Sequence, residues 1–190
     1  AEAVSQTTAK TEKAAPKKEQ EQKSVIANIA SVPASRIINI KTDVLDLKID
    51  TLGGNVISAK LLKYAKDLQH PDIPIQILSD DPEQLYVAQS GVKLTNNKPI
   101  QYRATKDSYK LAAGDKVLTV KLFAEVNGVK VTKIFTFTRD KYAIDVNYQL
   151  LNNANKPING NFFTQIVRKK PESSGGFFML HTYTGAAISS

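Results

Sequence analysis

The residues best suited to acid–base chemistry are few in this chain and far apart. Its only two histidines are His70 and His181. His70 precedes Pro71 in a polar stretch, which predicts a solvated loop position. His181 lies in the alternating run 177–187, where a strand histidine with a local hydrogen bond is expected; a general acid/base in a sugar-binding cleft is the alternative. That chemistry needs a second acid or base across the sugar ring, and no motif pairs His181 with a carboxylate. We therefore expect no enzymatic activity.

Acidic residues form two short clusters, and neither predicts a ligand site. Asp43 and Asp46 are three residues apart on a predicted strand, so their side chains point to opposite faces. Asp43 is expected to start the strand through a side-chain-to-backbone hydrogen bond, and Asp46 to lie on the wet face. Asp80 and Asp81 precede a proline and predict a turn, since a calcium loop needs several more oxygen ligands. With no cysteine in the chain either, we expect no metal and no cofactor.

The chain is basic, with a formal net charge of +8, which could indicate nucleic acid or an anionic membrane surface as a partner. Its lysines are scattered, and we assign Lys48, Lys121 and Lys133 to the polar side of alternating strands. Only residues 168–170 are clustered, without a basic helix or an aromatic RNA-binding motif. This pattern favours a solvated surface over nucleic-acid binding and leaves open a contribution to approaching anionic lipid headgroups.

The first 35 residues differ in composition from the rest. Ala, Lys, Glu, Gln, Thr and Ser dominate there, and no aromatic residue occurs. Such a segment cannot bury enough apolar area to offset the entropy of ordering it, so residues 1–35 are predicted to be a flexible polar linker. Residues 36–190 are long enough for one domain with a sizeable core. The chain begins with Ala1 and its single methionine is Met179, so we expect a piece of a longer protein.

From residue 36 onward, apolar and polar residues alternate with the period of a β-strand. One strand is predicted across residues 36–50, followed by a turn at Gly53-Gly54, where positive φ is easily adopted, and by a strand over 56–64. One helical turn is the most that we expect near residues 62–68. Residues 75–78 lie among prolines and are predicted to form at best a short edge strand.

The strongest local signal is Asn127-Gly128, which predicts a type I′ turn between strands over 117–126 and 129–138. In the second of these strands, Val129, Val131, Phe135 and Phe137 are predicted to share a face. Further strands are predicted over residues 85–89, 100–104, 108–111, 142–150, 158–167 and 177–188. Many short strands without an alternating βαβ pattern predict an all-β antiparallel sandwich or barrel.

Two separated phrases in the sequence carry a resemblance to a known family. They read TDVLDLKIDTLGG over residues 42–54 and FMLHTYTGAA over residues 178–187. In content and order they resemble the large periplasmic domain of the YidC membrane-protein insertase family of Gram-negative bacteria. The motif residues that we expect to be structural are Asp43, Leu45, Gly53, Gly54, His181, Gly185, Ala186 and Ala187.

The resemblance implies a fold and a function. The fold would be an antiparallel β-supersandwich of the galactose-mutarotase-like kind, incomplete at its C-terminus, with residues 1–35 tethering it to a preceding transmembrane helix. The whole protein would insert and fold inner-membrane proteins, alone or with the Sec translocon. This part would be a non-catalytic docking scaffold on the periplasmic face of the inner membrane. Its implied partners are the Sec translocon, the SecDF accessory subunits and nascent inner-membrane proteins.

Two alternatives stay open at this point. A carbohydrate-binding or carbohydrate-processing β-sandwich would gather exposed aromatic residues in a cleft, and Tyr64, Tyr86, Tyr102 and Tyr109 are candidates. A passive spacer without any partner is the other alternative.

Overall fold

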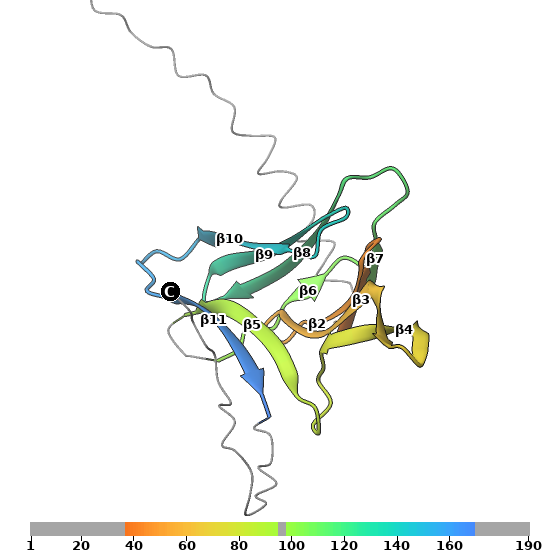
Figure 1. The fold of residues 1–190 in the computed structure, drawn as a ribbon. Coiled ribbons are helices and arrows are strands. Elements are labelled where there is room, and N and C mark those ends of the chain that lie inside the picture. The colour runs from red at the N-terminus through yellow and green to blue at the C-terminus, as the bar shows by residue number, and fades with distance from the viewer. Residues whose placement is uncertain (1–36, 95–97, 170–190) are drawn as a thin grey trace, which may run out of the picture.

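The computed structural model describes residues 37–94 and 98–169, which form two β-sheets (Figure 1). Seven strands form one sheet in the order β11-β5-β3-β2-β1-β7, with β4 paired to β3; the other sheet has the order β10-β9-β8-β6. The strands are β1 (Ile37–Lys41), β2 (Leu45–Asp50), β3 (Asn55–Asp67), β4 (His70–Leu78), β5 (Tyr86–Lys93), β6 (Arg103–Ala104), β7 (Ser108–Lys110), β8 (Val117–Val126), β9 (Val129–Thr138), β10 (Ile144–Asn152) and β11 (Asn161–Arg168).

Some predicted segments fall outside this part of the chain. The linker over residues 1–35, the strand over 177–188 and the second family phrase lie outside the described residues. In the part that is described, no helix is long and apolar enough to cross a membrane.

The segment 36–50 was predicted as one strand, and this is wrong: it contains two antiparallel strands, β1 and β2. The chain reverses because the Thr42 hydroxyl accepts hydrogen bonds from the backbone N–H groups of Val44 (3.2 Å) and Leu45 (2.9 Å). The expectation that Asp43 starts the strand in this way is therefore also wrong. Thr42 makes these bonds, while the Asp43 carboxylate accepts a bond from the distant backbone N–H of Asp140.

The helical turn expected near residues 62–68 is not formed, because β3 continues as a strand to Asp67. Its hydrogen-bond partner is β4, which begins at His70 and is longer than the segment 75–78 that was predicted. Pairing with β4 satisfies the backbone of this segment in an extended conformation. The edge position of this strand is confirmed, since among the described strands β4 is paired to β3 alone.

The β8–β9 hairpin agrees with its prediction. Asn127 and Gly128 have φ angles of 52° and 80°, as a type I′ turn requires, and the two strands pair without a register shift. The β9 residues alternate strictly between buried and half-buried positions, which confirms the shared buried face of Val129, Val131, Phe135 and Phe137.

The two sheets enclose one hydrophobic core. Residues of β1 and β2 from the first sheet and of β8 and β9 from the second belong to the same buried cluster, including Ile38, Leu47, Leu122 and Phe135. Each of these side chains is at most 1% exposed. The all-β antiparallel sandwich is confirmed; β1 and β7 form its one parallel pair among the described strands. The arrangement is compatible with a galactose-mutarotase-like supersandwich.

Candidate functional site

Lys133 is the most unusual residue of the core, because its side chain is 0% exposed. The prediction that it lies on the polar side of its strand is wrong, whereas Lys48 and Lys121 are exposed as predicted. The reason is the period of two along β9, which places residue 133 on the same face as Val131 and Phe135. The alternation in the sequence carries this signal, but it conflicts with the usual preference of lysine for the surface.

The Lys133 ammonium connects the two sheets through backbone carbonyl groups. Its Nζ atom donates hydrogen bonds to the carbonyl oxygens of Gly54 (2.7 Å) and Ser90 (2.5 Å), with the Gly53 oxygen at 3.4 Å. An ammonium group has three donors and no acceptor, so three carbonyl oxygens match its bonding capacity. Lys133 on β9 thereby holds the turn between β2 and β3, and also β5, of the opposite sheet.

The two glycines of this turn fit the contact with Lys133. Gly53 and Gly54 have φ angles of 84° and 63°, which other residues rarely adopt. A Cβ atom at Gly54 would come within 3.0 Å of the Lys133 Cδ atom. Gly54 is therefore required both by the backbone turn and by the close approach of the lysine side chain.

Aromatic rings flank the Lys133 ammonium. Its Nζ atom lies 5.1 Å from the ring centre of Phe135 and 5.4 Å from that of Tyr148, distances at which ring faces attract a cation. Burial lowers the pKa of Lys133 to about 7, while the carbonyl groups and the rings favour the charged form. Within the described ranges, no carboxylate forms an ion pair with it. The group is therefore a buried amine whose charge is compensated by dipoles alone.

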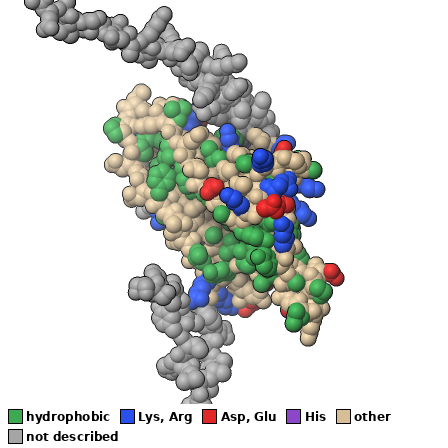
Figure 2. Space-filling view, turned by 45° about the horizontal axis from the view of Figure 1, so that its top comes forward, with side chains coloured by type: hydrophobic (Ala, Val, Ile, Leu, Met, Phe, Trp, Pro, Cys, Tyr) green, Lys and Arg blue, Asp and Glu red, His purple; other side chains and the backbone are tan. Residues whose placement is uncertain are grey.

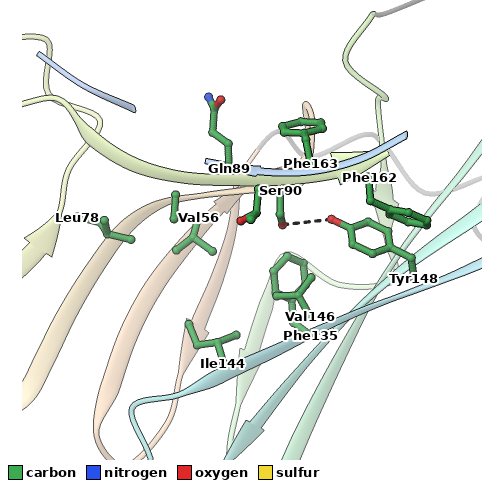
Figure 3. A pocket seen from close by; sticks show the side chains of 12 residues that line it. Val56, Leu78, Gln89, Ser90, Phe135, Ile144, Val146, Tyr148, Phe162 and Phe163 are labelled. Carbon is green, nitrogen blue, oxygen red and sulfur yellow. Dashed lines mark hydrogen bonds between the residues drawn. The ribbon is translucent and has the colours of Figure 1, made fainter. Parts of the chain in front are cut away.

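An apolar cavity of about 480 Å³ lies beside Lys133 (Figure 3). Its walls come from β3, β4, β5, β9, β10 and β11, and they include Phe135 and Tyr148, the two rings that flank the ammonium. The Tyr148 hydroxyl donates a hydrogen bond to the Ser90 hydroxyl at 3.1 Å, and the Phe162 ring lies 5.4 Å from that of Tyr148. This lining suits the binding of an apolar group. Among the described residues that line the cavity there is no carboxylate or histidine, so these residues do not present a pair of acid–base groups.

The motif residues of the first phrase lie at the two ends of β2. At one end, Asp43 accepts a hydrogen bond from the Asp140 backbone at 2.8 Å, and Leu45 is 2% exposed in the core. At the other end are Gly53 and Gly54, next to Lys133. The structure therefore does not bring the four residues together in one site. His181, Gly185, Ala186 and Ala187 lie outside the described residues.

The remaining candidates are separate from the cavity. His70 is exposed, with its Nδ1 atom 2.7 Å from the Asp67 carboxylate. Asp81 accepts a hydrogen bond from the backbone N–H of Glu83, which confirms a turn there. Across residues 37–94 and 98–169, no group of three or more His, Cys, Asp or Glu residues could hold a metal ion.

The four tyrosines proposed for a sugar-binding cleft are not gathered on the surface. Tyr102 is only 1% exposed and belongs to the core, whereas Tyr64 and Tyr86, on β3 and β5, are 55% and 40% exposed. Tyr64 packs instead against Tyr142, with ring centres 5.7 Å apart. No observation on these residues favours the carbohydrate alternative.

Comparison with known proteins gives a consistent result. Residues 37–190 match the family model described as the YidC periplasmic domain. A protein of Coxiella burnetii (strain Dugway 5J108-111) named membrane protein insertase YidC is 45% identical over 168 residues, covering 87% of this chain and 30% of that protein. Proteins of the same name from Azotobacter vinelandii (strain DJ / ATCC BAA-1303) and Pseudomonas putida (strain GB-1) are 38% identical and cover 84% and 85% of this chain, and 30% of each relative.

The fold and these matches define the class of protein: the chain forms a periplasmic β-sandwich domain. It belongs to the YidC periplasmic domain family, as the two sequence phrases indicated. The expected location on the periplasmic face of the bacterial inner membrane is confirmed with it. The chain spans about 30% of the length of the curated relatives it matches.

Proposed function

We propose that this chain is the non-catalytic docking domain of a membrane-protein insertase. The parent protein inserts and folds inner-membrane proteins, alone or with the Sec translocon, and this domain receives partners on the periplasmic side. The observation that carries the proposal is the family match over residues 37–190, to relatives named membrane protein insertase of which the chain spans about 30%. Insertion takes place in the membrane-embedded part of an insertase. A periplasmic β-sandwich lies outside the bilayer, so it is suited to contact with partners.

The proposed partners are nascent inner-membrane proteins, the Sec translocon and the SecDF accessory subunits. The apolar cavity beside Lys133 supports contact with nascent chains, since it can receive apolar side chains of the loops that emerge on the periplasmic side. Phe162 is 62% exposed at the edge of this cavity and is available for such contact.

Photo-crosslinking in the full-length insertase tests the proposal. A photoreactive amino acid replaces Phe162, and in a matched control it replaces Lys48, which is exposed on β2. We expect crosslinks from position 162 to nascent membrane proteins or to Sec subunits, and few from position 48. Absence of crosslinks at position 162 while insertion proceeds would favour the passive spacer. Saturable sugar binding by calorimetry would favour the carbohydrate alternative.

A further inference from the structure

The positive charge of the chain comes from two stretches of sequence that contain no acidic residue. Residues 85–106 and 146–171 include eight Lys and Arg residues and neither Asp nor Glu. The rest of the chain has 18 basic and 18 acidic residues, so the net charge of +8 arises entirely from these two stretches. On the face drawn in Figure 2, Lys and Arg side chains cover more of the surface than Asp and Glu side chains.

The fold brings the two acid-free stretches together. β5 belongs to the first stretch and β11 to the second, and these strands pair along their whole lengths. At one end of the pair, Lys169 forms an ion pair with Glu83 at 2.7 Å, so its charge is neutralised there. At the other end lies Lys93, which forms no ion pair within the described parts of the chain. The uncompensated positive charge is therefore greatest near Lys93.

A second pocket, of about 210 Å³, lies at this end of the strand pair. It is lined by β5, β11, the turn at residues 53–55 and the segment 98–102. Two lysines, Lys93 and Lys98, and three side-chain amides belong to its described lining, and no carboxylate does. The acid nearest to the turn along the chain is Asp50, whose Oδ1 atom accepts a hydrogen bond from the backbone N–H of Leu52 at 2.9 Å. The charge around this pocket is therefore positive.

This pocket is distinct from the cavity beside Lys133. In Figure 3 the side chains of Gln89 and Phe163 point away from Tyr148, which lines that cavity. Lys93 is four residues from Gln89 on β5, so both side chains point to the same side of the sheet. The second pocket therefore presents its charge on the side of the β5–β11 pair that faces away from Tyr148.

The wall of the pocket is ordered by contacts between β5 and β11. The Nε2 atom of Gln165 donates a hydrogen bond to the Oε1 atom of Gln89 at 2.7 Å. The Phe163 ring lies against Gly91, where a Cβ atom would come within 2.8 Å of the ring. The Nζ atom of Lys93 is 5.2 Å from the centre of the same ring. These contacts hold the ammonium beside the pocket before a ligand arrives, which reduces the entropy lost on binding.

A buried hydroxyl group in the lining lacks a hydrogen-bond partner. Tyr102 is 1% exposed, and its hydroxyl oxygen has no partner among the described residues. Burial raises the pKa of Tyr102, so the hydroxyl keeps its proton and remains a donor. Buried polar groups of this kind are nearly always paired in folded proteins. The lining therefore has donors in excess, which suits a ligand with acceptor oxygens.

The composition of the lining favours a carboxylate attached to an apolar carbon chain. A carboxylate only accepts hydrogen bonds, and its charge is opposite to that of the two lysines. Val92, Pro99 and Ile100 add apolar surface to the pocket, which an inorganic anion would not use. Asp and Glu side chains in a peptide combine the two properties.

Periplasmic loops of membrane proteins are a source of such side chains. Lys and Arg are concentrated in cytoplasmic loops, so acidic residues in periplasmic loops have fewer basic neighbours to neutralise them. A basic pocket without acidic residues attracts acidic loops and repels basic ones.

We propose that the pocket formed by β5, β11 and residues 98–102 binds Asp and Glu side chains of periplasmic loops in nascent membrane proteins. This rests on the proposed function, which brings such loops to the domain. The pocket would favour loops that have reached the correct side of the membrane.

Calorimetric titration of the 190-residue chain with peptides tests this inference. The first peptide is acetyl-Gly-Glu-Leu-Glu-Gly-amide, and its matched control has Gln in place of both Glu residues. We expect saturable binding of the acidic peptide, weakened by added salt, and about tenfold weaker binding of the control. Free glutarate should bind more weakly than the acidic peptide, because it lacks the apolar contacts of the leucine.

Variants of the chain locate the binding site. Lys93→Gln and Lys98→Gln should each lower the affinity for the acidic peptide about fivefold, since each removes a charged donor from the pocket. Lys121→Gln removes the same charge from β8, outside the pocket, and should leave the affinity unchanged. All three lysines are exposed, so the denaturation midpoints should stay the same. The lysines of residues 1–35 are identical in every variant and cannot cause a difference between them.

The inference would be overturned by a lack of saturable binding, by equal affinities for the two peptides, or by equal effects of Lys93→Gln and Lys121→Gln. Equal affinities for glutarate and the acidic peptide would assign the pocket to small organic acids and would overturn it as well. Crosslinking at Phe162 reports contact with partners whatever the charge of their loops. The proposed function and this inference can therefore fail separately.

Discussion

The Lys133 ammonium donates a hydrogen bond to the Gly54 carbonyl at 2.7 Å, and this bond joins the two sheets of the sandwich. One partner comes from the centre of β9, and the other from the turn that follows β2. The glycine pair at residues 53 and 54 therefore has two roles: it reverses the chain, and its carbonyl groups accept hydrogen bonds from the buried Lys133 ammonium.

Removal of the Lys133 side chain should destabilise the domain. Lys133→Ala leaves a cavity and removes the donor that the Gly54 and Ser90 carbonyl groups share, and we expect a loss of about 2–4 kcal/mol in the free energy of unfolding. Chemical denaturation measures it. The matched control is Lys121→Ala, on the exposed face of β8, which should change stability by less than about 0.5 kcal/mol. Equal effects of the two variants would contradict a structural role for Lys133.

Stability should depend on pH through Lys133. Burial lowers its folded-state pKa to about 7 from an ordinary value of 10.5, so between these pH values the unfolded chain binds more protons. The contribution of Lys133 to stability therefore rises with pH from about 7 to 10.5. The unfolding free energy of the native chain relative to Lys133→Met should increase across this range. A difference that is constant with pH would show that the amine keeps its proton when buried.

Gly54 and Lys133 should be energetically coupled. Gly54→Ala places a side chain at a φ of 63° and brings its Cβ atom to 3.0 Å from the Lys133 Cδ atom, and we expect a cost of about 1–3 kcal/mol. Part of this cost disappears when Lys133 is already alanine, so the double variant should be more stable than the sum of the single effects predicts. A double-mutant cycle by denaturation measures the coupling, and strict additivity would argue against it.

The β8–β9 turn should be sensitive to its glycine. Gly128→Val puts a β-branched residue at a φ of 80°, which should cost about 1–3 kcal/mol. Asn127→Gly, which tolerates the same backbone, should have a much smaller effect. The effects are compared through the denaturation midpoints of the two variants and the native chain. An unchanged midpoint for Gly128→Val is not compatible with the observed turn.

The sequence predicted correctly those structural elements that depend only on residues close together in the chain. The Asn127-Gly128 turn and the buried face of β9 follow from two adjacent residues and from a simple period. The end of β3 and the length of β4 did not follow, since the hydrogen bonds that decide them come from pairing between the two strands. Pairing between distant residues is not visible in a single sequence.

The main features of the site were only partly predictable. Gly53 and Gly54 were recognised as motif residues, but Lys133 was assigned to the surface because lysine is seldom buried. Only the fold shows that three carbonyl groups from the opposite sheet meet at its amine. The turn at Thr42 was also not predicted. Aspartate commonly accepts a hydrogen bond from a nearby backbone N–H, so Asp43 was expected to do so. In the structure the Thr42 hydroxyl accepts this bond, and the Asp43 carboxylate accepts one from the backbone N–H of Asp140.

The strand order of the seven-stranded sheet has a consequence for how the domain is assembled. Its centre is the consecutive pair β2 and β3, whereas β11 and β7 lie at the two edges. Among the described strands, two that come early in the sequence therefore form the middle of the sheet by short-range pairing, and later ones add outward from them. Pulse-labelled amide exchange during refolding should show protection of β2 before β11. A sheet that grows in this order never has to open a finished edge to admit a late central strand.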